Sequence, residues 1–198
     1  MSVSVPLYLR AVVRSLRQSY RQWRRRVLQL DPRRVVVRPL EAADVPVLDR
    51  HGEAATDHSY QVEWAAQQAG EVSVLVAWYG RRPMAIGLVH WAGPRQPAVQ
   101  AQYPGCPEIF RLHVRRRYRS MGLGSRLIEA FEQLARQRGH RQIGLGVTYA
   151  NPAAFALYQR LGYGEPAPSN FMDEYDVHGP DGSLTHQAHP AHFLVKTL

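Results

Sequence analysis

Cysteine, lysine and long apolar runs are scarce in this sequence of 198 residues. Cys106 is the only cysteine, so no disulfide can form within the chain. No apolar run approaches the ~20 residues of a membrane-spanning helix, and no apolar region of secretory type stands near the N-terminus. These absences predict a cytoplasmic protein. An arginine-rich, acid-poor start is also typical of a mitochondrial presequence, and that alternative stays open.

Lysine occurs once, at Lys196. A Walker A phosphate loop is therefore excluded, because that motif needs a lysine directly after its last glycine. His186, His189 and His192 have an H-x-x-H-x-x-H spacing that resembles a metal site. Pro190 would interrupt a helix that aligned them, and no cysteine supports the group, so we expect no bound metal.

The formal charge of +9 comes from the N-terminal part of the chain. Residues 1–38 contain ten arginines and one acidic residue, whereas residues 39–198 contain fifteen basic and fifteen acidic residues. We divide the chain into a basic arm, residues 1–32, and a domain, residues 33–198. The arm is predicted to form one long amphipathic helix, because arginines lie between apolar residues that recur every three or four positions: Leu9, Val12, Leu16, Tyr20, Trp23, Val27 and Leu30.

Several roles remain open for this arm. It can pack as an accessory helix on the domain or on a second subunit, which would give a homodimer. Arginine on one face and Trp and Leu on the other also suit an anionic membrane surface, which would make the protein membrane-peripheral. The same arginines suit the phosphates of a nucleic acid. Residues 1–30 are the expected contact with any such partner.

The segment Arg119–Ser125, R-S-M-G-L-G-S, is the motif around which the domain is organised. It follows an apolar-alternating run, residues 109–114, and precedes apolar residues at helical spacing, so a strand turns sharply into a helix here. Its two glycines let a ligand approach the backbone, and the first N–H groups of the helix favour an anion. The segment is therefore predicted to bind phosphate. It is not a dinucleotide fingerprint, because Leu127 stands where the third glycine would be.

Alternating strands and helices follow one another through the domain, which predicts an α/β (α+β) fold. The long connection through the central helix predicts that the strands at 108–114 and 143–148 are parallel. Residues 92–107 contain four prolines and two glycines without a period, and are predicted to be a loop beside the site. The remaining expected strands are 35–37, 72–79, 84–91, 174–177 and 192–198, and the expected helices lie within 41–69, at 126–138 and after Asn151.

Three segments, E-I-F-R-L-H-V, Y-R-S-M-G-L-G-S-R-L and Y-A-N-P-A-A-F-A-L-Y-Q-R-L-G-Y, together resemble the GNAT superfamily of acyl-CoA N-acyltransferases in order and spacing. The resemblance covers about residues 35–198, and Arg119, Gly122 and Gly124 match the central signature. It implies a mixed, twisted central sheet flanked by helices, splayed near its middle to admit the pantetheine arm, here with an extra basic N-terminal helix. It also implies acetyl-CoA (CoA) as the acyl donor.

The cofactor-binding positions of the family fall on two backbone segments and one side chain. Backbone groups of Leu112, His113 and Val114 would pair with pantetheine, and one N–H near them would polarise the thioester carbonyl. Asn151 matches a position that contacts the cofactor, and it is equally well suited to cap the helix that Pro152 begins. The pyrophosphate would bind to the N–H groups of Arg119, Ser120, Met121, Gly122, Leu123, Gly124 and Ser125.

Two residues match catalytic positions of the family. Tyr158 corresponds to the tyrosine that protonates the departing CoA thiolate, although its spacing from Phe155 and Leu161 also suits a buried core face. Glu108 stands where several members place the carboxylate that deprotonates the amine, directly or through water. A solvated glutamate at a strand end is the alternative for that position.

The resemblance implies an N-acetyltransferase that moves an acetyl group from acetyl-CoA to a primary amine by direct attack in a ternary complex. Direct attack is expected because no cysteine lies within the matched catalytic elements. The acceptor stays open: a small molecule, a protein N-terminus or a lysine. The alternative function is a non-catalytic acyl-CoA-binding regulatory module tethered by its basic arm. The presence of both Tyr158 and Glu108 favours the enzyme.

Overall fold

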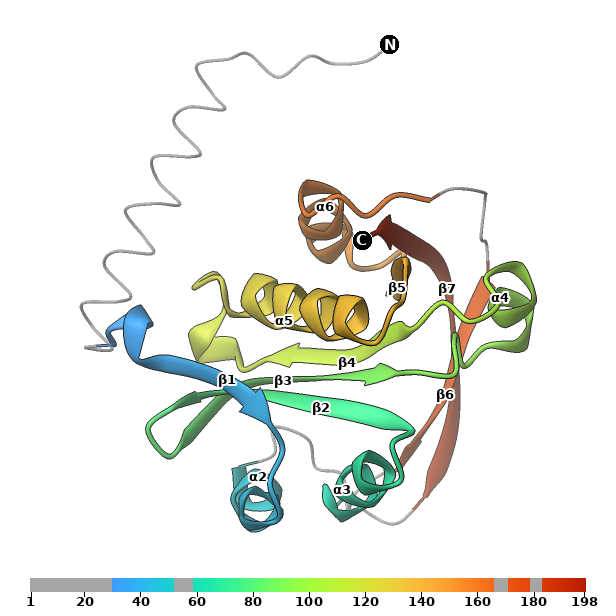
Figure 1. Ribbon diagram of the computed structural model, residues 1–198. Coiled ribbons are helices and arrows are strands. Elements are labelled where there is room, and N and C mark those ends of the chain that lie inside the picture. Colours follow the sequence, from blue (N-terminus) through green and yellow to red (C-terminus); the bar gives the residue numbers. More distant parts are fainter. Residues whose placement is uncertain (1–29, 52–58, 166–170, 179–182) are drawn as a thin grey trace.

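A seven-stranded mixed sheet forms the centre of the computed structural model, which describes residues 30–51, 59–165, 171–178 and 183–198 (Figure 1). The strand order is β1-β2-β3-β4-β5-β7-β6, and only the β4–β5 pair is parallel. The predicted mixed α/β fold is confirmed, as is the parallel crossover. In chain order the strands are β1 (Val35–Pro39), β2 (Val72–Tyr79), β3 (Arg82–His90), β4 (Glu108–Val114), β5 (Gln142–Thr148), β6 (Phe171–His178) and β7 (Leu184–Thr197).

Helices cover both faces of the sheet (Figure 1). On one face lie α5 (Leu123–Gln137) and α6 (Pro152–Arg160), and on the opposite face lie α2 (Val45–His51) and α3 (Gln61–Gln68). A short helix, α4 (Pro97–Gln102), packs near β6 and β7. Three single-turn 3₁₀ helices also occur, at Pro32–Arg34, Ala42–Asp44 and Arg116–Tyr118. The predicted arm helix lies outside the described residues, apart from Leu30, which is buried in the core.

The sheet separates two main apolar cores. The larger core lies under α5, because Leu127, Ile128 and Phe131 fall on the helix face that meets the sheet and are fully buried there. Each such side chain contributes ~1.5–3 kcal/mol by leaving water. The second core lies between the sheet and helices α2 and α3, and includes Leu48 and Trp78.

The structure corrects several boundaries. Residues 92–107 are not loop throughout, because Pro97 begins helix α4, and proline at a first helical position needs no amide donor. Helix α5 begins at Leu123, within the phosphate-binding segment, as the predicted turn from strand to helix there implies. Strand β7 begins at Leu184 rather than 192, because its whole length pairs with β6 or β5. Pairing with a distant strand is not visible in the local pattern.

A buried acid on α5 joins three elements. Glu132 accepts hydrogen bonds through both carboxylate oxygens from Lys196 Nζ on β7, at 2.9 and 2.8 Å. The Tyr163 hydroxyl, after α6, donates to Oε1 of the same carboxylate at 3.2 Å. A buried carboxylate is tolerated only when it is paired in this way. The pairing fixes α5, the end of α6 and β7 to one another.

Gly144 lies where β4 and β5 pair, and it leaves no room for a side chain. A Cβ there would stand 2.4 Å from Phe193 Cζ, and Phe193 is fully buried. Gly144→Ala is therefore expected to lower the free energy of unfolding by ~1–3 kcal/mol, the usual cost of overpacking. Urea denaturation measures this change. Gly146→Ala is the matched control, because its Cβ would meet Phe171 at 3.4 Å; equal midpoints for the two variants would contradict the prediction.

Candidate active site

Strands β4 and β5 separate soon after they begin. Their parallel pairing is limited to Glu108 with Gly144 and Ile109 with Leu145, although each strand has seven residues. A cavity of about 230 Å³ lies where they separate, lined by residues 109–112 of β4 and 145–148 of β5. Asn151, Tyr158 and Asp173 complete its lining. The splayed sheet that the resemblance implies is therefore present.

A bulge kinks β4 beside this cavity. Ile86 on β3 pairs with His113 and Leu88 pairs with Phe110, so Gly87 alone faces both Arg111 and Leu112. Arg111 adopts a left-handed backbone with φ of 49°, which is uncommon for a residue with a side chain. This kink was not predicted from the sequence. The available signal was Gly87, since an isolated glycine in a strand pattern often marks a bulge.

The predicted phosphate-binding segment turns from β4 into α5. Gly122 has φ of 83°, which glycine adopts without a steric penalty, and it precedes α5 without a side-chain cap. The first backbone hydrogen bond of the helix runs from the N–H of Arg126 to the carbonyl of Gly122, at 3.1 Å. The N–H groups of residues 123–125 precede that bond and have no partner within the helix. They suit an anion at the positive end of the helix dipole.

The side chains of this segment anchor it and leave its backbone accessible. Met121 and Leu123 are buried in the core, and Arg119 Nε donates to the carbonyl of Val114 at 3.0 Å. A Cβ at Gly124 would meet only Val114 and Leu157, at ordinary contact distances of 3.7 and 4.0 Å. The fold itself therefore leaves space at Gly124, and that space faces the end of β4 and helix α6.

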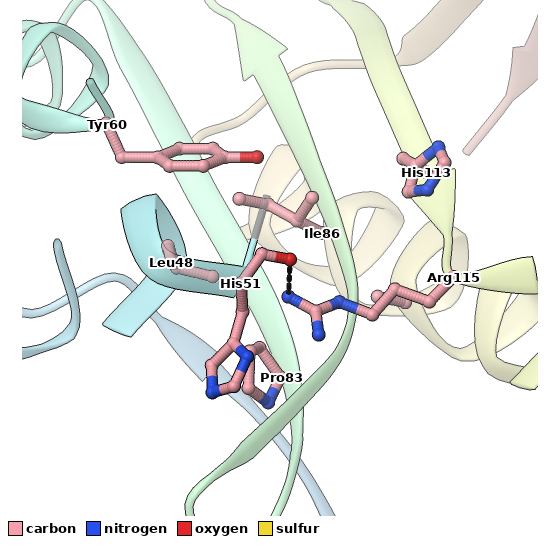
Figure 2. A pocket seen from close by; sticks show the side chains of 8 residues that line it. Leu48, His51, Tyr60, Pro83, Ile86, His113 and Arg115 are labelled. Carbon is pink, nitrogen blue, oxygen red and sulfur yellow. Dashed lines mark hydrogen bonds between the residues drawn. The ribbon is translucent and has the colours of Figure 1, made fainter. Parts of the chain in front are cut away.

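The side chains of Leu112 and His113 line different cavities. Leu112 lines the large cavity. The His113 side chain points away from it, into a small cavity of about 30 Å³ lined also by Tyr60, His51 and Arg115 (Figure 2). Arg115 donates from Nη2 to the carbonyl of His51 (Figure 2). The end of β4 is thereby fixed to the end of α2, on the face opposite α5.

Tyr158 lies on α6 and Asn151 lies directly before it, and both line the large cavity. Tyr158 is buried, and burial raises the pKa of its phenol above the ordinary value. The phenol is therefore protonated at neutral pH and can donate a proton. The Asn151 side chain accepts a hydrogen bond from the N–H of Ala154 at 3.1 Å, so it caps α6 while it lines the cavity. The core and functional interpretations of these residues are thus compatible with each other.

Glu108 begins β4 and is buried. Its Oε2 accepts hydrogen bonds from the backbone N–H of Arg95, at 2.9 Å, and from Arg95 Nε, at 3.2 Å. The Arg95 guanidinium also lies over the Phe110 ring, 4.3 Å from its centroid. The solvated strand end that was the alternative for Glu108 does not occur. The segment before α4 holds this carboxylate in place, and its role as a base stays a prediction.

Neither a cluster of metal-ligating side chains nor a membrane-spanning helix occurs among the described residues. No group of three or more histidine, cysteine or acidic side chains converges there. His192 Nδ1 on β7 lies 3.2 Å from Glu165 Oε1, and its ring packs against that of Tyr149 in a tilted arrangement, with ring centroids 4.2 Å apart. In the same part of the chain, no helix has the length and apolar character to cross a membrane.

Comparison with solved structures finds the same fold in several acetyltransferases. The IAA acetyltransferase from Bacillus cereus is 17% identical, with a TM-score of 0.55, over 83% of this chain and 99% of that one. Arabidopsis thaliana NAA60 in complex with acetyl-CoA is 14% identical, with a TM-score of 0.62, over 83% and 98%. The ribosomal-protein-S18-alanine N-acetyltransferase from Escherichia coli is 20% identical, with a TM-score of 0.56, over 82% and 93%. At these identities the likeness shows the fold alone.

Comparison of the sequence with curated proteins gave no match. The sequence model described as Acetyltransferase (GNAT) family, in contrast, matches residues 38–163, which is more than half of the chain. That range contains both separating strands, the phosphate-binding segment and Tyr158. The chain belongs to the GNAT family of acetyltransferases.

Proposed function

We propose that this protein is an N-acetyltransferase that moves an acetyl group from acetyl-CoA to a primary amine within a ternary complex. One observation carries the proposal: the cavity between β4 and β5 is lined by a buried, protonated phenol, Tyr158, and by the kinked strand that leads to the phosphate-binding segment. Acetyl-CoA would supply the acetyl group as a thioester.

The residues present fit this acyl donor. The N–H groups at the start of α5 would bind its pyrophosphate, and Gly124 leaves room beside them for the pantetheine arm. The edges of β4 and β5 that do not pair with each other would bind the arm as a strand binds its neighbour, and a backbone N–H near Leu112 would donate to the thioester carbonyl. Asn151 lines the same path.

Proton transfers are assigned to two side chains. Glu108 would accept the proton of the attacking amine, directly or through water, while the nitrogen forms its bond to the carbonyl carbon. Tyr158 would donate its phenolic proton to the sulfur as the carbon–sulfur bond breaks. Its raised pKa supports this role, because the group is protonated when the thiolate leaves.

Direct attack is favoured over an acyl-enzyme intermediate. Cys106, the only cysteine, is fully buried, and burial raises the pKa of its thiol to about 12. A thiol with so high a pKa has almost no thiolate at neutral pH, and the thiolate is the nucleophile. The amine would therefore attack the thioester without a covalent step through the enzyme.

The acceptor is proposed as a chemical class, a primary amine. Solved structures with this fold include an enzyme named for the alanine of ribosomal protein S18 and a spermidine N-acetyltransferase chimera. Their named acceptors share only a reactive amine. We accordingly propose the amine class, with small molecules, protein N-termini and lysine side chains as the candidates to be tested.

Purified protein mixed with acetyl-CoA and a panel of amines should release free CoA thiol with at least one amine. The thiol is measured with a chromogenic disulfide reagent, and mass spectrometry should show a gain of one acetyl group on that amine. Saturable acetyl-CoA binding without turnover on any amine would instead identify a binding module. Absence of binding would contradict both functions.

Gly124→Leu should weaken acetyl-CoA binding at least about tenfold and leave the fold intact, because leucine favours a helix and its neighbours there are apolar. Isothermal titration calorimetry gives the dissociation constant, and circular dichroism gives the unfolding midpoint. Gly164→Leu is the matched control, since its Cβ meets no atom within 4 Å and it does not line the cavity. Unchanged affinity in the Gly124 variant would show that acetyl-CoA binds elsewhere.

Tyr158→Phe should leave the acetyl-CoA dissociation constant nearly unchanged and lower kcat by about 10²-fold, the lower end for a general acid, because a thiolate is a good leaving group. Stopped assays at saturating substrates measure kcat. A kcat within about twofold of the parent, below the usual effect of a proton donor, would assign Tyr158 to the core alone.

A further inference from the structure

The kink of β4 places a side chain where a regular strand would not. Phe110 packs toward the core beside α2 and α3, so regular alternation would turn Arg111 toward the apolar core beneath α5. With a φ of 49° at Arg111, the guanidinium instead reaches α3, and Leu112 packs against the α5 core. The bulge thus keeps a charged group out of an apolar core.

Gly87 on β3 accommodates the kink from the other strand. A Cβ on Gly87 would stand 2.9 Å from Leu112 Cδ1 and 3.0 Å from Phe131 Cε2. Because glycine has none, Leu112 can fold over β3 and contact α5. The apolar side of the kink is therefore stabilised by packing.

Glu63 of α3 stabilises the other side of the kink. Its side chain is 5% exposed, and Oε1 accepts a hydrogen bond from Arg111 Nη1, whose side chain is 45% exposed. A buried carboxylate needs a cation beside it. Arg111 supplies that cation with its backbone in the left-handed region, so the same residue forms the pair with Glu63 and the kink of β4.

We propose that Glu63 is a positioning residue that acts through Arg111 to keep β4 kinked beside the acyl-binding cavity. The kink sets the direction of the backbone groups at Leu112, which lines that cavity and would donate to the thioester carbonyl. The inference rests on the proposed function for its kinetic consequence. The strain in the backbone at Arg111 is tested separately, by measuring the stability of the fold.

The test compares alanine with glycine at position 111 in chains that already carry Glu63→Gln, so that no buried charge is left unpaired. Both double variants lose the ion pair, and they differ only in how readily the backbone adopts a positive φ. Alanine resists the left-handed region by about tenfold in population, whereas glycine does not. The glycine variant should therefore show kcat/KM for acetyl-CoA about tenfold above the alanine variant.

Urea unfolding of the same pair separates this inference from the proposed function. Glycine should be at least as stable as alanine at position 111, the reverse of its usual effect within a strand. This stability result does not depend on any turnover. If the alanine variant is more stable than the glycine variant, the inference that the backbone at position 111 is strained is wrong. Absence of acetyl-CoA turnover in the parent protein would count against the proposed function alone.

Arg38→Ala is the matched control. Arg38 on β1 binds the buried Asp44 at 2.6 and 2.8 Å, a strand-to-helix ion pair of the same kind that lies away from the cavity. It should lower stability and leave kcat/KM unchanged. Equal kcat/KM for the alanine and glycine variants at 111 would overturn the proposal, whether both are active or both are inactive. If kcat/KM fell equally in both variants relative to the parent, the Arg111 side chain itself would contact a substrate.

Discussion

The separation of β4 from β5 after two paired positions is the constraint on which the rest of the domain depends. Each strand is held on its outer side, β4 by β3 and β5 by β7. Beyond those two positions the backbone groups of β4 and β5 do not pair with each other across the gap. The cavity therefore offers hydrogen bonds along its length to an extended ligand. Helices α5 and α6 cover this gap from one face and supply the phosphate-binding amides and Tyr158.

Buried acids join the surrounding elements to this sheet. Asp44, Glu63, Glu108 and Glu132 are the buried charged residues of the described chain. Each pairs with a cation from another element or segment: Arg38, Arg111, Arg95 and Lys196. Burial alone would raise the pKa of Asp44, but hydrogen bonds from Arg38 and the Glu41 amide outweigh it and lower the pKa. Two of the four pairs hold β4 beside the cavity, so the same interaction type that secures the fold also shapes the site.

Features fixed by short stretches of sequence were predictable. Gly122 permits the left-handed backbone of the turn before α5, and Asn151 followed by Pro152 begins a helix, so both features agree with local chemistry. The kink at Arg111 was not predicted, because its contacts are with Glu63, 48 residues earlier, and with Gly87 across the sheet. The pairing of Glu108 with Arg95 was missed for the same reason. Contacts between distant segments leave no periodic trace in either one.

The position of Lys196 has a consequence for the protein as a target of acylation. The chain contains 24 arginines and one lysine, Lys196. The ammonium group of Lys196 donates hydrogen bonds to both carboxylate oxygens of Glu132. In this pair the nitrogen is directed at a buried carboxylate of the same chain and not at a thioester. Arginine carries nearly all the positive charge, and its guanidinium does not lose its proton in proteins. The chain can thus carry a large positive charge without offering readily acetylated lysine side chains to its own acyl donor.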